Sequence, residues 1–161
     1  MKVIVSPEIL RICPEFVGAS VEAAVLNTSF SEGLWQEIKS ICADYKAHLT
    51  PDLLKDMSGI HATRRVYRAF GKDPSRYRPA SEALVRRVLQ GKDLYQIDTL
   101  VDLINLASMK FGYSIGGFDA DKFTGDTLTL GIGREDEPYE GIGRGMLNIA
   151  GLPVYRDDKG G

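Results

Sequence analysis

Apolar residues recur at two spacings along the first third of the chain, and each spacing predicts one kind of element. Between Phe16 and Asn27, small and β-branched residues stand at every second position, which is typical of a β-strand. Farther on, apolar residues recur three and four positions apart, as on a helix that Ser29 or Ser31 caps and that has Glu32 in its first turn. The apolar face of this helix comprises Leu34, Ile38, Ile41, Cys42 and Tyr45, with Trp35 beside it and expected in the core.

Three further helices are expected in the middle of the chain. Thr50 and Pro51 start a short one, as the N-cap and the first helical residue. The pattern from Gly59 to Phe70 favours a second helix, and residues 81–90 form a third that Ser81 caps. A glycine follows each of the last two, as is usual after a helix C-terminus.

The last helix gives way to short strands. Asp98 or Thr99 opens this helix, and glycines and short strands follow from Ile115, with strands expected at residues 127–132 and 152–155. Helices first and strands later indicate an α+β fold, with mixed β-sheet layers flanked by helices, rather than a regular βαβ repeat. The apolar face expected for the last helix comprises Leu100, Leu103, Ile104 and Ala107.

The length of the chain suits one core. With 161 residues and 43% hydrophobic content, a single domain over residues 1–161 is expected. The strand at 152–155 and the turn after it reach Gly161 where a hairpin partner is expected. A structural element is therefore expected to be missing, as in a domain truncated at its C-terminus.

Short apolar runs and the cysteine spacing indicate a cytoplasmic protein. The N-terminal apolar run ends after three residues at Ser6, and the run at residues 100–107 is interrupted by polar positions, so neither a signal peptide nor a membrane span is expected. Cys13 and Cys42 have no CxxC spacing and are expected to be buried, reduced thiols.

Positive charge is concentrated in one stretch of the chain. The formal net charge is −2, but residues 61–92 hold nine lysines and arginines against two acidic residues, a local charge of +7 that leaves −9 elsewhere. Arginine clamps phosphates and aromatic rings stack on unpaired bases, so the stretch favours contact with RNA; solvated helix faces with a few salt bridges are an equally weighted alternative. The candidate RNA-binding residues are Arg64, Arg65, Tyr67, Arg68, Arg76, Tyr77, Arg78, Arg86 and Arg87.

The loop at residues 76–79 stands directly before a helix, where an anion can also meet free backbone amides. In the structural alternative, Tyr77 packs the loop down and Arg78 pairs with Glu82. The functional interpretation is preferred for this loop.

For the other candidate sites in the sequence, a structural role is the favoured interpretation. Asp102 and Asn105 share a helical face and are expected to satisfy polar groups of the fold. The segments 131–133 and 141–145 lack the strand-then-helix context of a dinucleotide loop and are expected to be turns and bulges. Two histidines are too few for a histidine-rich metal site, and His48 is expected at a helix end, so no metal or cofactor is predicted.

The stretch RRVYRAFGKDPSRYRP at residues 64–79 resembles free-standing relatives of the third and fourth modules of the phenylalanyl-tRNA synthetase beta subunit. The resemblance continues in the SEAL and RR motifs within residues 81–87, in VDLIN at 101–105 and in GGFDADK at 116–122. It covers roughly the last two thirds of the chain, and the combination is more specific than any single motif. In the synthetase, this unit is the editing domain, which hydrolyses tyrosine wrongly esterified to tRNA.

The resemblance implies a tRNA-binding protein that recognises the acceptor end and hydrolyses wrongly aminoacylated tRNA in trans, with an aminoacyl-tRNA synthetase as a candidate partner and no DNA or membrane. Backbone groups and the terminal ribose hydroxyl can position and activate water in such a site, so no catalytic side chain is assigned. The implied amino-acid pocket comprises Asn105, Gly116, Gly117, Phe118 and Asp119.

Two departures from the family pattern keep other functions open. Gly116 stands where the synthetase domain has its pocket histidine, and the glycine-rich loop and glutamate that complete that pocket would lie beyond Gly161. The alternatives are a non-catalytic tRNA-binding or RNA-binding module, and a protein that binds small molecules or amino acids without RNA.

Overall fold

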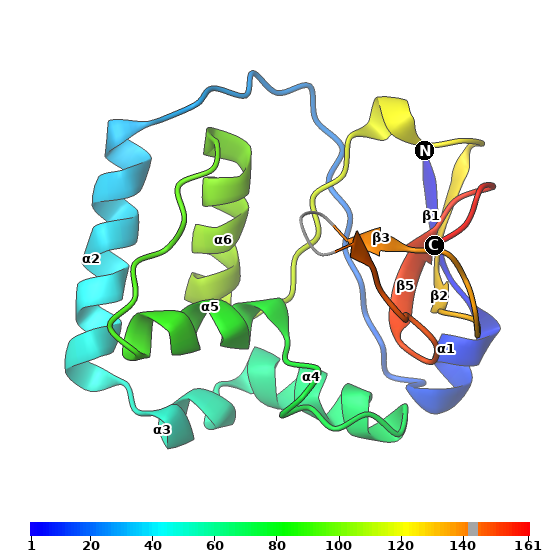
Figure 1. Cartoon of the computed structure of the whole chain (residues 1–161), viewed down its shortest axis with the longest axis horizontal. Helices are drawn as coiled ribbons and strands as arrows, with labels where there is room; N and C mark the ends of the chain where they lie inside the picture. Colours follow the sequence, from blue (N-terminus) through cyan, green and yellow to red (C-terminus); the bar gives the residue numbers. More distant parts are fainter. Residues whose placement is uncertain (142–144) are drawn as a thin grey trace. The chain divides into compact units, whose positions relative to one another are not determined.

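The computed structural model describes residues 1–141 and 145–161 and forms two compact units (Figure 1). The first unit comprises residues 1–22, 66–73 and 118–161, and the second comprises residues 23–65 and 74–117. Strands lie in the first unit and most helices in the second, which confirms the α+β prediction. No helix of the described residues is both long and apolar enough to cross a bilayer.

A mixed three-stranded sheet forms the centre of the first unit. Its order is β1 (Lys2–Val5), β2 (Thr127–Ile132) and β5 (Pro153–Arg156), with β1 parallel and β5 antiparallel to β2. The strands predicted at 127–132 and 152–155 are thereby confirmed, within one residue at the ends of β5. Helix α1 (Pro7–Ile12) packs beside β2 and buries Ile9.

Three small elements complete the first unit. A 3-10 turn, η1, spans Ala120–Lys122, and β3 (Glu140–Gly141) pairs antiparallel with β4 (Gly145–Met146). The turn expected at 131–133 is wrong for its first two residues, because Gly131 and Ile132 pair with β5 inside β2. Of the turn expected at 141–145, residues 142–144 lie outside the described part of the chain.

The strand predicted between Phe16 and Asn27 does not form. Val17, Val21 and Leu26 are 90%, 93% and 90% exposed, and the segment has no strand partner among the described residues. Alternation shows only that side chains would fit a pleated, half-buried surface, whereas a strand also needs a neighbour to share its hydrogen bonds. The first strand is β1 instead, whose four residues are too few to show a period.

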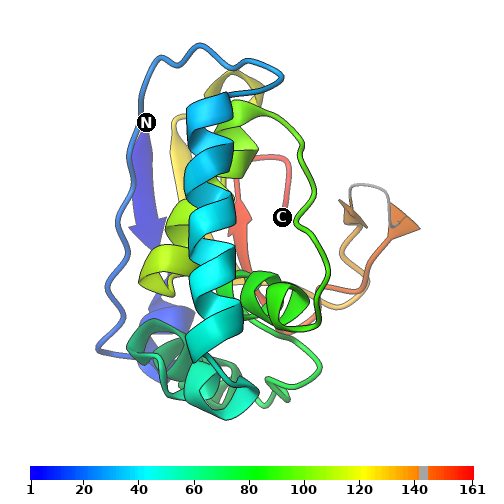
Figure 2. The same ribbon diagram turned by 90° about the vertical axis from the view of Figure 1, so that its left-hand side faces the viewer.

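The second unit is built from helices. Helix α2 (Glu32–His48) packs against both α5 (Ala80–Leu89) and α6 (Thr99–Phe111), and α3 (Pro51–Asp56) packs on α5. Figure 2 shows α2 lengthwise in front of α5 and α6. Helix α4 (Ser58–Ala69) begins in the second unit and continues into the first.

Three predicted helix caps are confirmed. The Ser31 hydroxyl accepts a hydrogen bond from the Leu34 amide at 3.4 Å, and the Thr50 hydroxyl accepts one from Leu53 at 3.3 Å. The Asp98 carboxylate accepts one from the Val101 amide at 2.8 Å. Each side chain satisfies an amide that the first turn leaves without a helical partner, and each of these caps acts within three residues of its own position.

The predicted cap at Ser81 is wrong. Helix α5 starts at Ala80 with Pro79 at its N-cap, and Ser81 is fully buried in the first turn. Its hydroxyl donates to the Gly112 carbonyl at 3.1 Å, next to the C-terminus of α6. A serine that the sequence assigns to the start of one helix therefore satisfies a carbonyl at the end of another.

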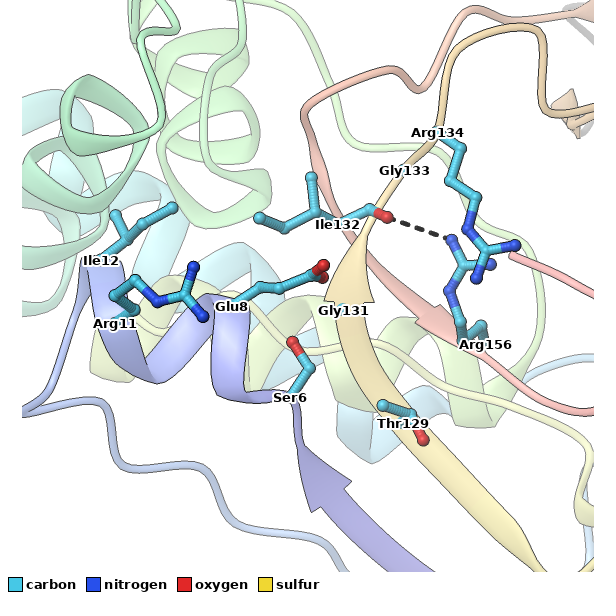
Figure 3. Close-up of a pocket in the computed structure, with 10 residues that line it drawn as sticks. All are labelled: Ser6, Glu8, Arg11, Ile12, Thr129, Gly131, Ile132, Gly133, Arg134 and Arg156. Atoms are coloured by element: carbon cyan, nitrogen blue, oxygen red, sulfur yellow. Dashed lines mark hydrogen bonds between the residues drawn. The ribbon is translucent and has the colours of Figure 1, made fainter.

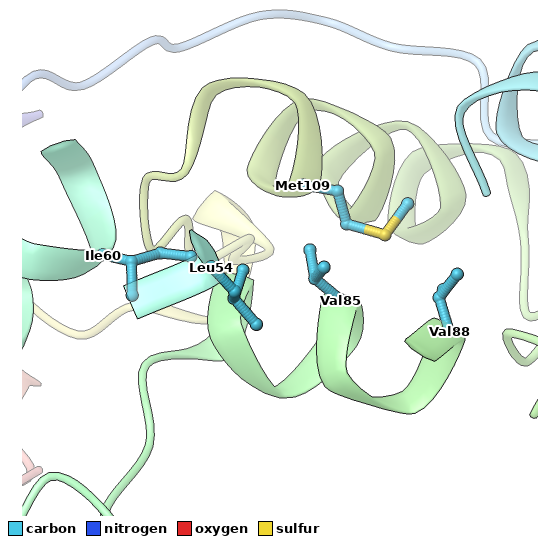
Figure 4. Packing of buried hydrophobic residues seen from close by; sticks show 5 residues of the cluster. All are labelled: Leu54, Ile60, Val85, Val88 and Met109. Atoms are coloured by element: carbon cyan, nitrogen blue, oxygen red, sulfur yellow. The ribbon is translucent and has the colours of Figure 1, made fainter. Parts of the chain in front are cut away.

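The buried face of α6 differs from the predicted one. Leu103 is 52% exposed, whereas Leu106 and Met109 are buried together with Asp102 and Ser108. Met109 joins Leu54, Ile60, Val85 and Val88 in the main core of the second unit (Figure 4).

Both cysteines are free thiols. Cys13 is buried and Cys42 is half-buried, and burial raises the pKa of the Cys42 thiol.

Candidate nucleic-acid interface

Two of the candidate RNA-binding arginines share one buried carboxylate. Arg64 Nη1 donates to both oxygens of Glu82, at 2.9 and 2.8 Å, and Arg86 Nε donates to Glu82 Oε1 at 2.7 Å. Glu82 is fully buried and Arg64 is 8% exposed. Burial raises the pKa of Glu82, but the two guanidinium groups outweigh it and hold the pKa below its usual value. The pairing of Arg78 with Glu82 considered for this loop is therefore wrong.

Two other arginines of the loop before α5 are exposed. Arg76 and Arg78 flank Tyr77, which is half-buried, and Pro79 behind them is buried. The Arg76 guanidinium carbon lies 5.7 Å from the centroid of the Tyr77 ring. The loop is thus anchored by its apolar residues while both guanidinium groups stay in contact with solvent.

An arginine in the last turn of α5 stacks on an exposed tyrosine. Arg87 Nε donates to the Asp93 carbonyl at 2.6 Å, and its guanidinium carbon lies 4.0 Å from the centroid of Tyr95, a residue that is 66% exposed. Stacking holds the planar guanidinium in place, and an exposed ring is a surface on which a base can stack. The sequence prediction missed Tyr95, whose only signal was an aromatic residue in a polar loop.

The remaining candidates lie on α4. Arg65 and Arg68 are exposed and three positions apart, so they share one side of the helix. Tyr67 is half-buried, and burial raises its pKa. Lys72, just after the helix, donates to the Ala150 carbonyl at 2.7 Å within the first unit. The exposed positive charges of this helix are therefore those of its two arginines.

The residues of the implied amino-acid pocket fall into both compact units. Asn105 is half-buried on α6, and Gly116 and Gly117 follow that helix in an exposed segment of the second unit. A Cβ on Gly117 would lie 2.6 Å from the end of the Ile104 side chain, so a glycine lets the segment pass close to α6. Asp119, in the first unit, caps η1 by accepting from the Asp121 amide at 3.1 Å.

Phe118 belongs to an aromatic cluster in the first unit. Its ring centroid lies 5.7 Å from that of Phe123 and 5.4 Å from that of Tyr155. With Tyr139 and the carboxylate of Asp157, these rings line a cavity of about 410 Å³. A cavity of this size, apolar with one acidic edge, is large enough for an amino-acid side chain.

The described residues offer no cluster of three histidine, cysteine, aspartate or glutamate side chains that could hold a metal ion. His48, at the end of α2, lies 2.9 Å from Asp44 through its Nδ1 atom, and His61 is exposed on α4. Both histidines are therefore placed on helices, and His48 is at the helix end predicted for it.

Comparison with protein families matches residues 62–161 to the B3/4 domain. The chain belongs to the B3/4 domain family, the family of the B3/B4 domain of the phenylalanyl-tRNA synthetase beta subunit. Searches of curated proteins and of solved structures gave no match. The matched range contains every candidate RNA-binding residue and every residue of the implied pocket. Membership of this family supports a binding role related to tRNA, in agreement with the resemblance seen in the sequence.

Proposed function

We propose that this B3/4 domain protein binds the acceptor end of tRNA through the exposed Arg76 and Arg78 before α5 and through the half-buried Arg87 in its last turn. The proposal rests on two observations together: the chain belongs to a family related to tRNA, and α5 has Arg76 and Arg78 before its start and the Arg87–Tyr95 stack at its last turn. A helix of 10 residues is about 15 Å long, so the two groups of cations stand apart along one element.

Each group suits a different part of a nucleic acid. The exposed guanidinium groups of the loop suit phosphates, which arginine contacts bidentately. The Tyr95 ring suits an unpaired base such as those at a single-stranded end, because stacking needs only one free ring face. Arg64 and Arg86 are assigned to the stability of the second unit, since their guanidinium groups are committed to Glu82.

Replacing Arg76 and Arg78 together by glutamine is expected to weaken tRNA binding by about tenfold per arginine, because a hydrogen-bonded charge pair is lost at each position. The slope of log affinity against log salt should fall by about one for each phosphate contact removed. Fluorescence anisotropy with labelled tRNA at several salt concentrations measures both quantities.

The matched control for that experiment is Lys39→Gln with Lys46→Gln, which removes the same charge from exposed positions of α2. The control should keep most of the affinity. Equal weakening by both pairs would mean that net charge alone drives binding, and unchanged binding in the arginine variant would refute the proposed surface.

Hydrolysis of wrongly aminoacylated tRNA in trans is the second candidate function, and the aromatic cavity at Phe118 favours it. The cavity is large enough for an amino-acid side chain, and Phe118 is one of the residues that the family resemblance assigns to the pocket. Because Gly116 takes the place of the family's histidine, water would be positioned by backbone groups and by the ribose hydroxyl of the substrate.

Incubation with a panel of tRNAs, each charged with a wrong amino acid, tests this second function. Release of the amino acid above the buffer rate is expected for at least one substrate, and Phe118→Ala should reduce it without changing tRNA affinity. Phe111→Ala, which also truncates an exposed phenylalanine, is the control. If no amino acid is released from any substrate, the protein is a tRNA-binding module without catalytic activity. If the protein binds free amino acids but not tRNA, the result favours a site for small molecules.

A further inference from the structure

A second group of charged residues lies in the first unit and includes none of the arginines described above. Residues from the β1–α1 junction, from β2 and its C-terminal end, and from β5 line a cleft of about 520 Å³ (Figure 3). The polar and charged lining includes Ser6, Glu8, Arg11, Thr129, Arg134 and Arg156. The first three of these precede the part of the chain that matches the B3/4 domain, so the family match does not cover this wall.

One guanidinium of the cleft is fixed by a two-point ion pair. Arg156 Nη1 and Nη2 donate to the two oxygens of Glu137 at 2.7 and 2.8 Å, and Nη2 also donates to the Ile132 carbonyl at 3.1 Å. The hydrogen bonds from Arg156, followed by the one from the Arg134 amide, lower the pKa of Glu137 to about 2, so the pair stays charged over the physiological range. Arg156 is therefore a rigid part of the cleft wall.

The floor of the cleft is left open by a glycine. A Cβ on Gly131 would lie 3.6 Å from Arg156 Nε and 4.0 Å from the Ser6 hydroxyl oxygen. Both polar atoms thus border the space that a side chain at this position would occupy. The nitrogens that hold Glu137 are Nη1 and Nη2, so Nε of Arg156 remains as a donor beside this space.

Two further guanidinium groups reach the cleft from opposite walls. Figure 3 shows Arg11 on α1 and Arg134 after β2, and both are exposed. Within the described residues, neither guanidinium makes an ion pair or hydrogen bond. Counting Glu8 and Glu137 against the three arginines leaves the cleft with a net charge of +1, which favours an anion.

We infer that this cleft binds a phosphate group of an RNA backbone, held by Arg11 and Arg134 from opposite walls. A tetrahedral oxyanion offers acceptors in several directions, which suits donors on opposing walls better than a flat surface would. The positive charge of the cleft by itself predicts an anionic ligand, whereas the choice of RNA as the source of the phosphate rests on the proposed function. A zwitterion such as a free amino acid is the rival ligand, because Glu8 could accept its ammonium group.

The test uses Arg11→Gln with Arg134→Gln in the full chain, with the dinucleotide UpU and tRNA as separate probes. Affinity for both probes, measured by calorimetry, is expected to fall by about tenfold, since each substitution removes a charged donor. The thermal midpoint should stay unchanged because both side chains are exposed and unpaired within the described chain. Unchanged affinity for UpU and for tRNA would overturn the inference and leave the arginines beside α5 as the proposed RNA surface.

The Glu8→Gln variant distinguishes a phosphate ligand from an amino-acid ligand, because it should change their affinities in opposite directions. Removing this negative charge should strengthen binding of a phosphate several-fold, whereas it should weaken binding of an amino acid whose ammonium group contacts Glu8. Binding of inorganic phosphate without UpU would also overturn the RNA assignment, since only a small anion would then fit. The Arg76→Gln with Arg78→Gln variant leaves the cleft intact, so it should keep its affinity for UpU while its affinity for tRNA falls. The two double variants therefore distinguish failure of the cleft from failure of the surface beside α5.

Discussion

Replacing Glu82 by alanine is expected to destabilise the protein by about 3–5 kcal/mol, the usual cost of removing one partner from a buried ion pair. Glu82 is fully buried, and its two oxygens accept hydrogen bonds from Arg64 and Arg86. Without the carboxylate, Arg64 keeps a positive charge at a position that is only 8% exposed. The Pro74 carbonyl, at 3.4 Å from Arg64, cannot replace it as a counter-ion.

Denaturant unfolding of the purified variant measures this cost, with Glu37→Ala as the matched control. Glu37 pairs with Lys110 at 3.0 Å, but both side chains are about half exposed, so its loss should cost less than about 1 kcal/mol. Equal midpoints for the two variants would show that the buried network contributes no more than a surface pair.

The pH dependence of stability gives a second readout of Glu82. Its pKa is lower in the folded protein than in the unfolded chain, so its contribution is fully present above the ordinary glutamate pKa of about 4.3 and is lost as pH falls through the folded value. Wild-type stability should therefore decrease on acidification below about pH 4.3 more steeply than that of Glu82→Gln. Parallel curves for the two proteins would contradict the assignment.

Replacing Asp102 by alanine is expected to cost about 2–5 kcal/mol, because two hydrogen bonds to a buried carboxylate are lost. Asp102 is 1% exposed, and its carboxylate accepts from Trp35 Nε1 at 2.7 Å and from the Ile97 amide at 3.2 Å. The same side chain thus joins α2 to the loop that leads into α6. Its structural role was the one preferred from the sequence.

The fluorescence of Trp35, the only tryptophan of the chain, measures the effect of the Asp102 variant directly. Its emission should change in the folded state, and its unfolding midpoint should move to lower denaturant. Asp44→Ala, at an exposed position of α2, should leave both unchanged. A double-mutant cycle that combines Asp102→Ala with Trp35→Phe isolates the hydrogen bond between these two side chains. Additive effects of the two substitutions on stability would mean that the residues are not coupled.

Local chemistry explains which parts of the fold could be predicted. The helix starts at Ser31, Thr50 and Asp98 were predictable because a cap acts on amides two or three residues away. Ser81 has the same chemical character, yet its hydroxyl bonds to Gly112, which is 31 residues away. The sequence near a serine cannot reveal a partner that only packing brings close.

The candidate site was predicted as a charged stretch but not residue by residue. Seven arginines in residues 61–92 identified the region, and the family resemblance identified tRNA as the partner class. Nothing in the sequence separates Arg64, which is buried against Glu82, from Arg76 and Arg78, which are exposed. That division depends on tertiary packing, which buries one side of α4 and leaves the loop before α5 exposed, and the face of α6 was misjudged for the same reason.

The segment between Phe16 and Asn27 forms no strand, and it makes the start of the chain a tethered peptide. Strand β1 is held to β2 by a parallel ladder, and Ile9 of α1 is buried beside that strand. Residues 17–30 lie outside any strand or helix and are exposed. A cut in this tether would therefore turn one chain into two without removing a packed contact of β1 or α1. The N-terminal piece is in effect a ligand of the sheet, and the covalent link serves mainly to keep its local concentration high.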